Sequence, residues 1–250
     1  METPQTINKM SIKLDQIKID EVVEHRVDSK SKYLIDLLKI AYNEFPDIQF
    51  ASSFGAEDMV VHHAIHLSKQ PIQIFTLDTE RLPNETYALI AQVKKQLNQK
   101  INIFHPNKHA VEEYVTQNGK NAFYESLEMR KRCCYIRKVE PLKRALSQKS
   151  AWMTGMRSEQ AQTREALAIR EFDENFQLEK FNPLANWSEN DVWAYIKINK
   201  VPYNKLHDQF YPSIGCAPCT RAISSGEDIR AGRWWWENPE NKECGLHIKG

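Results

Sequence analysis

Five cysteines are the residues of this chain best suited to chemistry, and four of them form two close pairs. The first pair is Cys133-Cys134, and the second is the CxxC pair of Cys216 and Cys219. The fifth, Cys244, stands near the C-terminus in the sequence ECGLH. Four thiolates match what a tetrahedral zinc ion or an iron–sulfur cube requires, which leaves Cys244 as a free thiol nucleophile.

Disulfide bonds are the main alternative use of these cysteines. They require an oxidising compartment, yet residues 1–20 carry charges throughout and lack the apolar core of a secretory signal. Adjacent cysteines also rarely bridge each other, because the resulting ring is strained. Buried structural thiols would explain one or two positions, but not both pairs. We therefore expect metal or cluster ligation in a reducing, cytoplasmic setting.

The spacing within the first pair bears on the choice between zinc and iron. Zinc sites favour a gap of roughly two to four residues, which lets two sulfurs converge from one turn. Adjacent residues on a helix point about 100° apart. Cys133 and Cys134 therefore converge poorly on one ion but can reach separate corners of a cluster. The spacing favours a [4Fe-4S] cluster, with zinc as the alternative.

Composition and charge limit the class of protein. The chain has 250 residues, 41% of them hydrophobic and 27% charged, which is enough material for one substantial core. A net charge of +1 provides no basic field that would attract nucleic acid or a membrane surface. The apolar runs are too short to span a bilayer. We expect one globular domain that binds neither nucleic acid nor membrane, and a homo-oligomer is compatible with the sequence.

Alternating strand and helix patterns surround the cysteines. Short apolar runs predict strands at 48–51, 72–77, 101–104 and 151–154. Helical periodicity predicts helices at 59–67 and 85–97, after an earlier helix whose apolar positions run from Leu34 to Phe45 and which ends before Pro46. Strands that alternate with helices of this length indicate βαβ units. The sequence thus predicts an α/β fold with a parallel sheet flanked by helices.

The pattern changes after residue 155. Residues 166–170 and 176–181 predict a hairpin, and Ser188 with Asp191 forms a capping-box signature for a following helix. The three tryptophans at 234–236 predict packing, with stacking on a nucleotide base as the alternative.

Three loops follow predicted strands at the edge where parallel sheets bind ligands. The first opens a helix with small residues whose backbone N–H groups suit an anion, and an ordinary turn with an acidic cap is the alternative. Its candidate binding residues are Ser52, Ser53, Gly55, Glu57 and Asp58. The second loop offers Thr79 and Arg81, and the third offers Arg157.

The segment around the first cysteine pair, RKRCCYIRK at 130–138, is strongly basic. A solvated run of charges is one interpretation. The other is that Lys138, four residues after Cys134 and on the same helical face, screens a negatively charged cluster and an anionic substrate together. Near Cys244, the residues Arg230, Arg233 and His247 add further cationic or titratable side chains.

Taken in order, these segments resemble the iron–sulfur adenylyl-sulfate (APS) reductases, a branch of the assimilatory sulfonucleotide reductases. The matching text is SSFGAED, LDTERLPNET, KRCCYIRKVEPL, CAPC, GEDIRAGRWWWE and ECGLH. The resemblance implies the adenine-nucleotide α-hydrolase-like (PP-loop) fold. It also implies three regions: an N-terminal helical extension (1–45), a nucleotide-binding α/β domain (46–206), and a CxxC segment with a mobile catalytic tail packed on that domain (207–250).

Two departures from the family pattern stand out. The serine-rich SGGxDS of ATP pyrophosphatases is absent, which argues against cleavage of ATP. Many family members read DTGR where this chain has Asp78-Thr79-Glu80-Arg81, so Glu80 stands where glycine is common. Plant relatives carry a fused thioredoxin-like domain, whereas we expect this chain to use an external reductant.

The resemblance implies reduction of APS to sulfite and AMP in sulfate assimilation and cysteine biosynthesis. Cys244 would attack the sulfate sulfur, release AMP and form an S-sulfocysteine that thioredoxin or a glutaredoxin-like dithiol then reduces. The implied [4Fe-4S] ligands are Cys133, Cys134, Cys216 and Cys219, and the implied phosphosulfate contacts are Lys138, Arg230, Arg233 and His247. The alternatives are reduction of 3′-phospho-APS (PAPS), dual specificity, or a non-catalytic iron–sulfur or zinc nucleotide-binding regulator.

Overall fold

The computed structural model describes residues 13–160 and 167–238. Within them, a six-stranded sheet forms the centre of the molecule, in the order β3-β2-β1-β4-β6-β5. The strands are β1 (Gln49–Ala51), β2 (Gln73–Leu77), β3 (Ile101–Phe104), β4 (Ala151–Met153), β5 (Arg170–Asp173) and β6 (Leu178–Phe181). All described strands are parallel except β5, which runs antiparallel to β6 at the sheet edge. The predicted α/β fold with a parallel sheet is confirmed.

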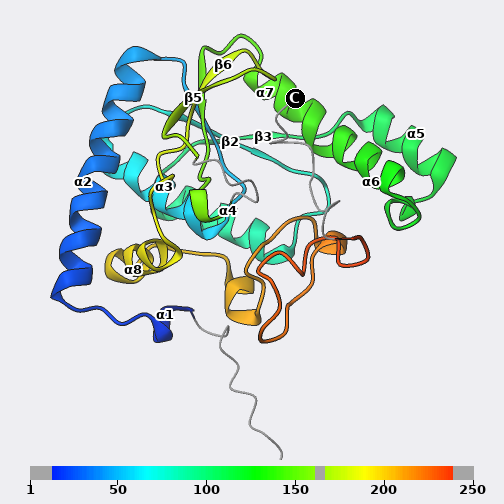
Figure 1. The fold of residues 1–250 in the computed structure, drawn as a ribbon. Helices are drawn as coiled ribbons and strands as arrows, with labels where there is room; N and C mark the ends of the chain where they lie inside the picture. The colour runs from blue at the N-terminus through cyan, green and yellow to red at the C-terminus, as the bar shows by residue number, and fades with distance from the viewer. Residues whose placement is uncertain (1–12, 161–166, 239–250) are drawn as a thin grey trace, which may run out of the picture.

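Helices flank the sheet on both faces (Figure 1). The described α-helices are α1 (Lys13–Gln16), α2 (Glu21–Glu44), α3 (Ala56–Ser68), α4 (Asn84–Gln96), α5 (Lys108–Asn118), α6 (Leu127–Cys134), α7 (Glu140–Leu146) and α8 (Glu189–Asn199), of which α1 packs on α8. A π-helical turn, Tyr135–Val139, joins α6 to α7. Short 3₁₀ turns occupy Ala122–Tyr124, Ser158–Gln160, Lys205–Gln209 and Ala217–Cys219.

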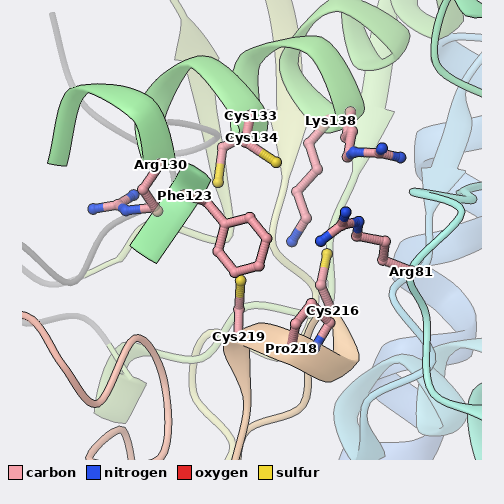
Figure 2. Close-up of a pocket in the computed structure, with 10 residues that line it drawn as sticks. Arg81, Phe123, Arg130, Cys133, Cys134, Lys138, Cys216, Pro218 and Cys219 are labelled. Atoms are coloured by element: carbon pink, nitrogen blue, oxygen red, sulfur yellow. The ribbon is translucent and has the colours of Figure 1, made fainter. Parts of the chain in front are cut away.

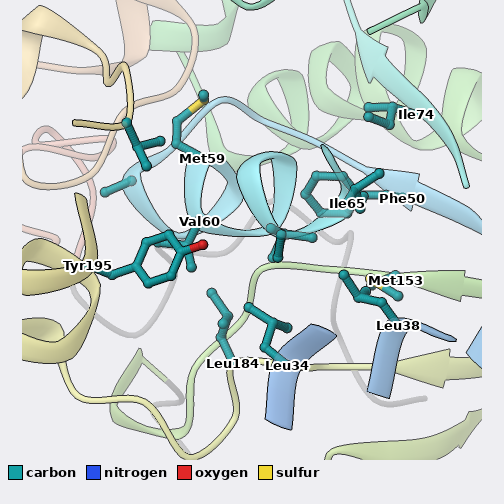
Figure 3. Close-up of a cluster of buried hydrophobic side chains, with 14 of the residues drawn as sticks. Leu34, Leu38, Phe50, Met59, Val60, Ile65, Ile74, Met153, Leu184 and Tyr195 are labelled. Atoms are coloured by element: carbon teal, nitrogen blue, oxygen red, sulfur yellow. The ribbon is translucent and has the colours of Figure 1, made fainter. Parts of the chain in front are cut away.

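Two hydrophobic clusters form because successive strand residues point to opposite faces of the sheet. On β2, Ile74 belongs to the larger cluster and Phe75 to the smaller one. The larger cluster packs α2, α3 and α8 on one face, and Figure 3 shows some of its members: Leu34, Leu38, Phe50, Met59, Val60 and Tyr195. The smaller cluster packs α7 on the other face through Leu142, Ala145 and Leu146.

The observed bounds of the strands and helices can be compared with those predicted from the sequence. The four strands predicted first correspond to β1–β4, with ends that differ by at most one residue. The capping box of Ser188 and Asp191 is present at the start of α8, so that prediction is also confirmed. Helix α2 begins well before Leu34, because the Asp20 carboxylate accepts a hydrogen bond from the Val23 N–H (2.8 Å) and starts the helix there.

The predicted hairpin is present, but the predicted position of its first strand, 166–170, is wrong. Strand β5 covers Arg170–Asp173, where Arg170 pairs with Phe181 and Asp173 with Leu178. The position of this edge strand follows its partner β6 rather than its own hydrophobicity, since Phe172 on β5 is exposed. The division into regions 1–45, 46–206 and 207–250 stays a prediction. Among the described helices, none is both long and apolar enough to cross a membrane.

Candidate active site and cysteine centre

The two cysteine pairs lie on opposite walls of one pocket (Figure 2). Cys133 and Cys134 are the last residues of α6, and Cys216 and Cys219 bracket the 3₁₀ turn of the CxxC segment. The other lining residues are Arg81, Phe123, Arg130, Arg137, Lys138 and Pro218. Folding therefore brings together the four residues that the sequence predicts as metal ligands, although their role as ligands stays a prediction.

The four thiols are divided between two segments that face each other across the pocket. Among the described residues, no group of three or more His, Cys, Asp or Glu side chains is placed to hold a single metal ion. The Cys216 thiol instead donates to Thr79 Oγ1 (3.2 Å). Four cysteines on two walls of one pocket provide the number of thiolates that either a [4Fe-4S] cluster or a tetrahedral zinc ion takes.

The electrostatics of the pocket also fit a metal group. Burial raises the pKa of the Cys219 thiol to about 12, with charge on Cys216 and Cys134 adding to the rise and Lys138 opposing it. Burial likewise raises the pKa of Cys133, and Arg137 opposes that rise. Buried thiols in this state become thiolate ligands only when a metal replaces their protons. The basic side chains around the pocket suit a cluster of net negative charge.

Trp234 bears on whether the pocket suits a metal group that contains sulfur. Its side chain is almost fully buried and packs in one cluster with Phe123, Cys134, Cys216 and Cys219. Its indole Nε1 has no hydrogen-bond partner among the described residues. A buried N–H normally finds an acceptor, and sulfur in this pocket would provide one. The predicted packing role of this tryptophan is confirmed.

A π-helical turn directly follows the first cysteine pair. Helix α6 starts at the N-cap Ser126, whose side chain accepts from the Met129 N–H, and ends at Cys134. The wider turn Tyr135–Val139 then carries Lys138, which lines the same pocket as the cysteines. Figure 2 shows the Lys138 side chain reaching into the space between the two pairs. The π turn thus places Lys138 in the same pocket as Cys134. Such turns are frequent at functional sites.

The loop after β2 connects the cysteine centre to the ligand-binding edge of the sheet. Thr79 contacts Cys216 through its hydroxyl and accepts a hydrogen bond from Arg137 Nη1 at its backbone oxygen (2.7 Å). Glu80 adopts a left-handed backbone with φ of 57°. Glycine adopts this conformation more readily than glutamate does. Arg81 lies over the Phe123 ring, with its guanidinium 5.0 Å from the ring centre.

The loop after β1 is internally hydrogen-bonded. The Ser53 N–H and hydroxyl both donate to Asp58 Oδ2, at 2.6 and 2.7 Å. Gly155, in the loop after β4, lies so close that a Cβ there would meet Asp58 Oδ1 at 2.2 Å. Burial raises the Asp58 pKa to about 6. The structure therefore uses Asp58 to shape the loop, and the predicted contacts of Ser53, Gly55 and Asp58 with substrate stay predictions.

The loops after β1 and β4 are also joined by a buried arginine. Arg157 Nε donates to Glu57 (2.9 Å) and its Nη1 to Glu159 (2.5 Å), while Gln160 donates to Glu57 (2.8 Å). The Arg157 side chain is only 4% exposed. Because its charge is already compensated by two carboxylates, we expect Arg157 to position the loops at least as much as it contacts a substrate.

The candidate residues of the C-terminal segment fall into two groups. Arg233 is buried: its guanidinium packs against Gly215 and donates to the Ile214 oxygen (3.3 Å). Arg230 is half-buried. Cys244 and His247 lie outside the described residues. The pocket also contains Arg130 and Pro218, which lie in the RKRCCYIRK and CAPC segments, and Phe123, for which the sequence offered no signal because its partners are distant in the chain.

His62 holds the remaining candidate, Ser52, in place. Its ring is completely buried, with Nε2 2.9 Å from the Ser52 hydroxyl and Nδ1 2.7 Å from Gln99 Oε1. Since the Gln99 amide nitrogen donates to the His62 backbone oxygen, its Oε1 is the acceptor, and Nδ1 carries the proton. Nε2 therefore accepts from Ser52, whose oxygen in turn accepts from the Phe54 N–H (3.2 Å).

Replacement of His62 by glutamine is expected to change how stability depends on pH. Burial lowers the His62 pKa to about 4, from 6.5 in the unfolded chain. The native state thus binds its proton less tightly, and the stability that neutral His62 provides is full above pH 6.5 and lost as pH falls towards 4. This loss amounts to about 3 kcal/mol. In urea titrations, the stability advantage of the wild type over His62→Gln should therefore shrink by about that amount between pH 7 and 4.

The matched control for this experiment is the exposed His105, replaced in the same way. If wild type and His62→Gln lose stability in parallel as the pH falls, His62 does not carry this linkage.

Comparison with known proteins identifies the family. A sequence model of the phosphoadenosine phosphosulfate reductase domain matches residues 47–222. The adenosine 5′-phosphosulfate reductase of Allochromatium vinosum is 56% identical over 213 residues, which cover 85% of this chain and 83% of the relative. That of Burkholderia cepacia is 57% identical over 201 residues, which cover 80% of each protein.

Solved structures agree on the fold. A phosphoadenylyl-sulfate (PAPS) reductase from Candida auris, crystallised with phosphate, aligns with a TM-score of 0.65 at 27% identity, over 83% of this chain and 99% of that one. A yeast FAD synthetase aligns with a TM-score of 0.53 at 14% identity, over 84% of this chain and 71% of that one, and shows the α/β fold alone. On this sequence and structural similarity, the chain belongs to the phosphoadenosine phosphosulfate reductase family.

Proposed function

We propose that this protein is an adenylyl-sulfate reductase that converts APS to sulfite and AMP in sulfate assimilation. Relatives with this name match most of the chain at 56 and 57% identity. The observation that carries the proposal is the position of the cysteine centre beside the ligand-binding edge of the sheet. Thr79, in the loop after β2, contacts Cys216 directly, so a substrate bound over this loop would lie next to the four thiols.

The residues of the pocket suit a [4Fe-4S] cluster as cofactor. Cys133, Cys134, Cys216 and Cys219 would hold it, with Arg81, Arg137 and Lys138 offsetting its negative charge. When bound, the cluster would keep the four thiolates deprotonated and tie α6 to the CxxC segment. We propose a reducing, cytoplasmic setting, in which these thiols stay available as ligands.

Cys244 would carry the chemistry. Its thiolate attacks the sulfate sulfur of APS, the bond from sulfur to the phosphate oxygen breaks, AMP leaves, and an S-sulfocysteine remains. A thiolate of an external dithiol such as thioredoxin then attacks the Cys244 sulfur and releases sulfite. The second thiol resolves the mixed disulfide, so the two electrons come from the dithiol, which leaves oxidised.

Basic side chains would stabilise the charge that develops on the AMP phosphate. Lys138 lies between the cysteines and the loop of Thr79 and Arg81, where one ammonium can offset both the cysteine centre and a phosphosulfate. We propose the same electrostatic role for Arg81, Arg230, Arg233 and His247. The loops of Ser52 and Arg157 would form the wall that receives the adenosine.

Assays of the anaerobically purified protein test this proposal. With thioredoxin and its reductase, APS should yield sulfite and AMP, and PAPS should react poorly. The protein should contain about four irons and four sulfides per chain. No sulfite from either nucleotide would contradict the reductase function, and sulfite from PAPS alone would make the chain a PAPS reductase. Zinc without sulfide would overturn the cluster.

A further inference from the structure

A buried ion pair links helix α6 to the last described turn of the chain. Arg130 Nε and Nη2 donate to the two carboxylate oxygens of Glu237, at 3.0 and 2.8 Å. The Arg130 side chain is 0% exposed and that of Glu237 is 8% exposed. Because two parallel hydrogen bonds fix direction as well as distance, this pair holds the turn in one orientation on α6.

The same turn is attached to both cysteine-bearing segments. The Arg130 guanidinium lies 4.6 Å from the centre of the Trp234 ring, and the backbone N–H of Trp234 donates to the backbone oxygen of Cys219 (3.2 Å). Trp234 has a left-handed backbone, with φ of 41°. A bulky residue keeps this conformation only where its surroundings impose it. Residues 234–237 are thus held against α6 by Arg130 and against the CxxC segment by Cys219.

Glu237 is also the residue at which the segment leading to the proposed nucleophile Cys244 begins, and we call it the root of that segment. Cys244 follows it by seven residues, and an extended chain spans at most about 3.6 Å per residue. The thiol is therefore confined to within about 25 Å of the Arg130–Glu237 pair. If the root is fixed close to the pocket, the effective concentration of the tethered Cys244 thiol in the pocket is high. If the root detaches, this effective concentration falls.

We propose that the Arg130–Glu237 pair is a positioning device that anchors the root of the Cys244 segment beside the cysteine centre. Both carboxylate oxygens of Glu237 are engaged by Arg130, so its role in this proposal is the placement of Cys244 rather than contact with the substrate. The inference rests on the proposed function, because it assumes that Cys244 is the nucleophile. It connects Arg130 of the basic segment with Glu237 of GEDIRAGRWWWE, two residues that the sequence alone did not pair.

The test measures Cys244 chemistry separately from nucleotide binding. Glu237 is the better residue to change, since Arg130 also interacts with Cys134. In Glu237→Gln and Glu237→Ala, adduct formation on mixing with APS without reductant should slow by at least tenfold, more in the alanine variant. Affinity for AMP and the visible absorption of the cluster should stay close to wild type. The matched control is Glu44→Gln, which removes a bidentate but exposed and distant partner of Arg170.

Three other outcomes would contradict either the anchor or the proposed function. Adduct formation at the wild-type rate in Glu237→Ala overturns the inference. Loss of the cluster in both Glu237 variants, or a parallel fall in AMP affinity and adduct rate, makes the pair a structural part of the pocket and also overturns it. If the wild type itself forms no adduct, the proposed function fails, and that result is distinct from failure of the anchor.

Discussion

Replacement of Cys244 by serine is expected to abolish sulfite formation while the protein keeps its iron and its affinity for nucleotide. A serine hydroxyl is scarcely ionised at neutral pH and cannot take the place of a thiolate nucleophile. Cys244 belongs to neither of the cysteine pairs that line the pocket, so its loss should leave the cysteine centre intact.

The wild type provides the positive reference for this variant. Mixed with APS and no reductant, it should release one AMP per active site and gain an SO₃ group of roughly 80 Da, which a dithiol then removes as sulfite. Cys244→Ser should show neither change. Steady sulfite production by the serine variant, or an adduct mapped to another residue, would contradict the assignment of Cys244 as nucleophile.

Replacement of Cys219 by serine is expected to remove the cluster and the activity together. Cys219 is 9% exposed and packs with Cys134, Cys216 and Trp234. A serine there provides no thiolate, so one corner of the cluster would lose its ligand and open to solvent. The measurement is iron and sulfide content, visible absorption and sulfite release after anaerobic purification.

The matched control for Cys219 is the neighbouring Thr220→Ser. The Thr220 hydroxyl accepts from the Gly215 N–H (3.1 Å) and donates to the Cys216 oxygen (3.0 Å), contacts that serine can keep. Thr220→Ser should therefore retain iron and activity. Full iron and sulfide in Cys219→Ser would show that this cysteine is not a ligand. Together, the variants of Cys219 and Cys244 separate the residues that build the site from the residue that reacts.

Local patterns in the sequence determined most of the architecture and supplied the hypothesis for the chemistry. Strands β1–β4 were predictable because a short apolar run between polar turns depends only on neighbouring residues. The capping box of Ser188 and Asp191 was predictable for the same reason. The two cysteine pairs and the lone Cys244 indicated cluster chemistry and a nucleophile from residue type and spacing alone.

The tertiary structure alone decided which distant residues meet. It brought Cys133 and Cys134 to the CxxC pair, placed Lys138 in the pocket through a π turn, and compensated the charge of Arg157 with two carboxylates. It also paired Arg130 with Glu237, two residues that lie in separate parts of the sequence. The physical reason is that hydrogen bonds and ion pairs between distant segments form only after the fold has brought those segments together, and no periodicity or spacing in the chain encodes that juxtaposition.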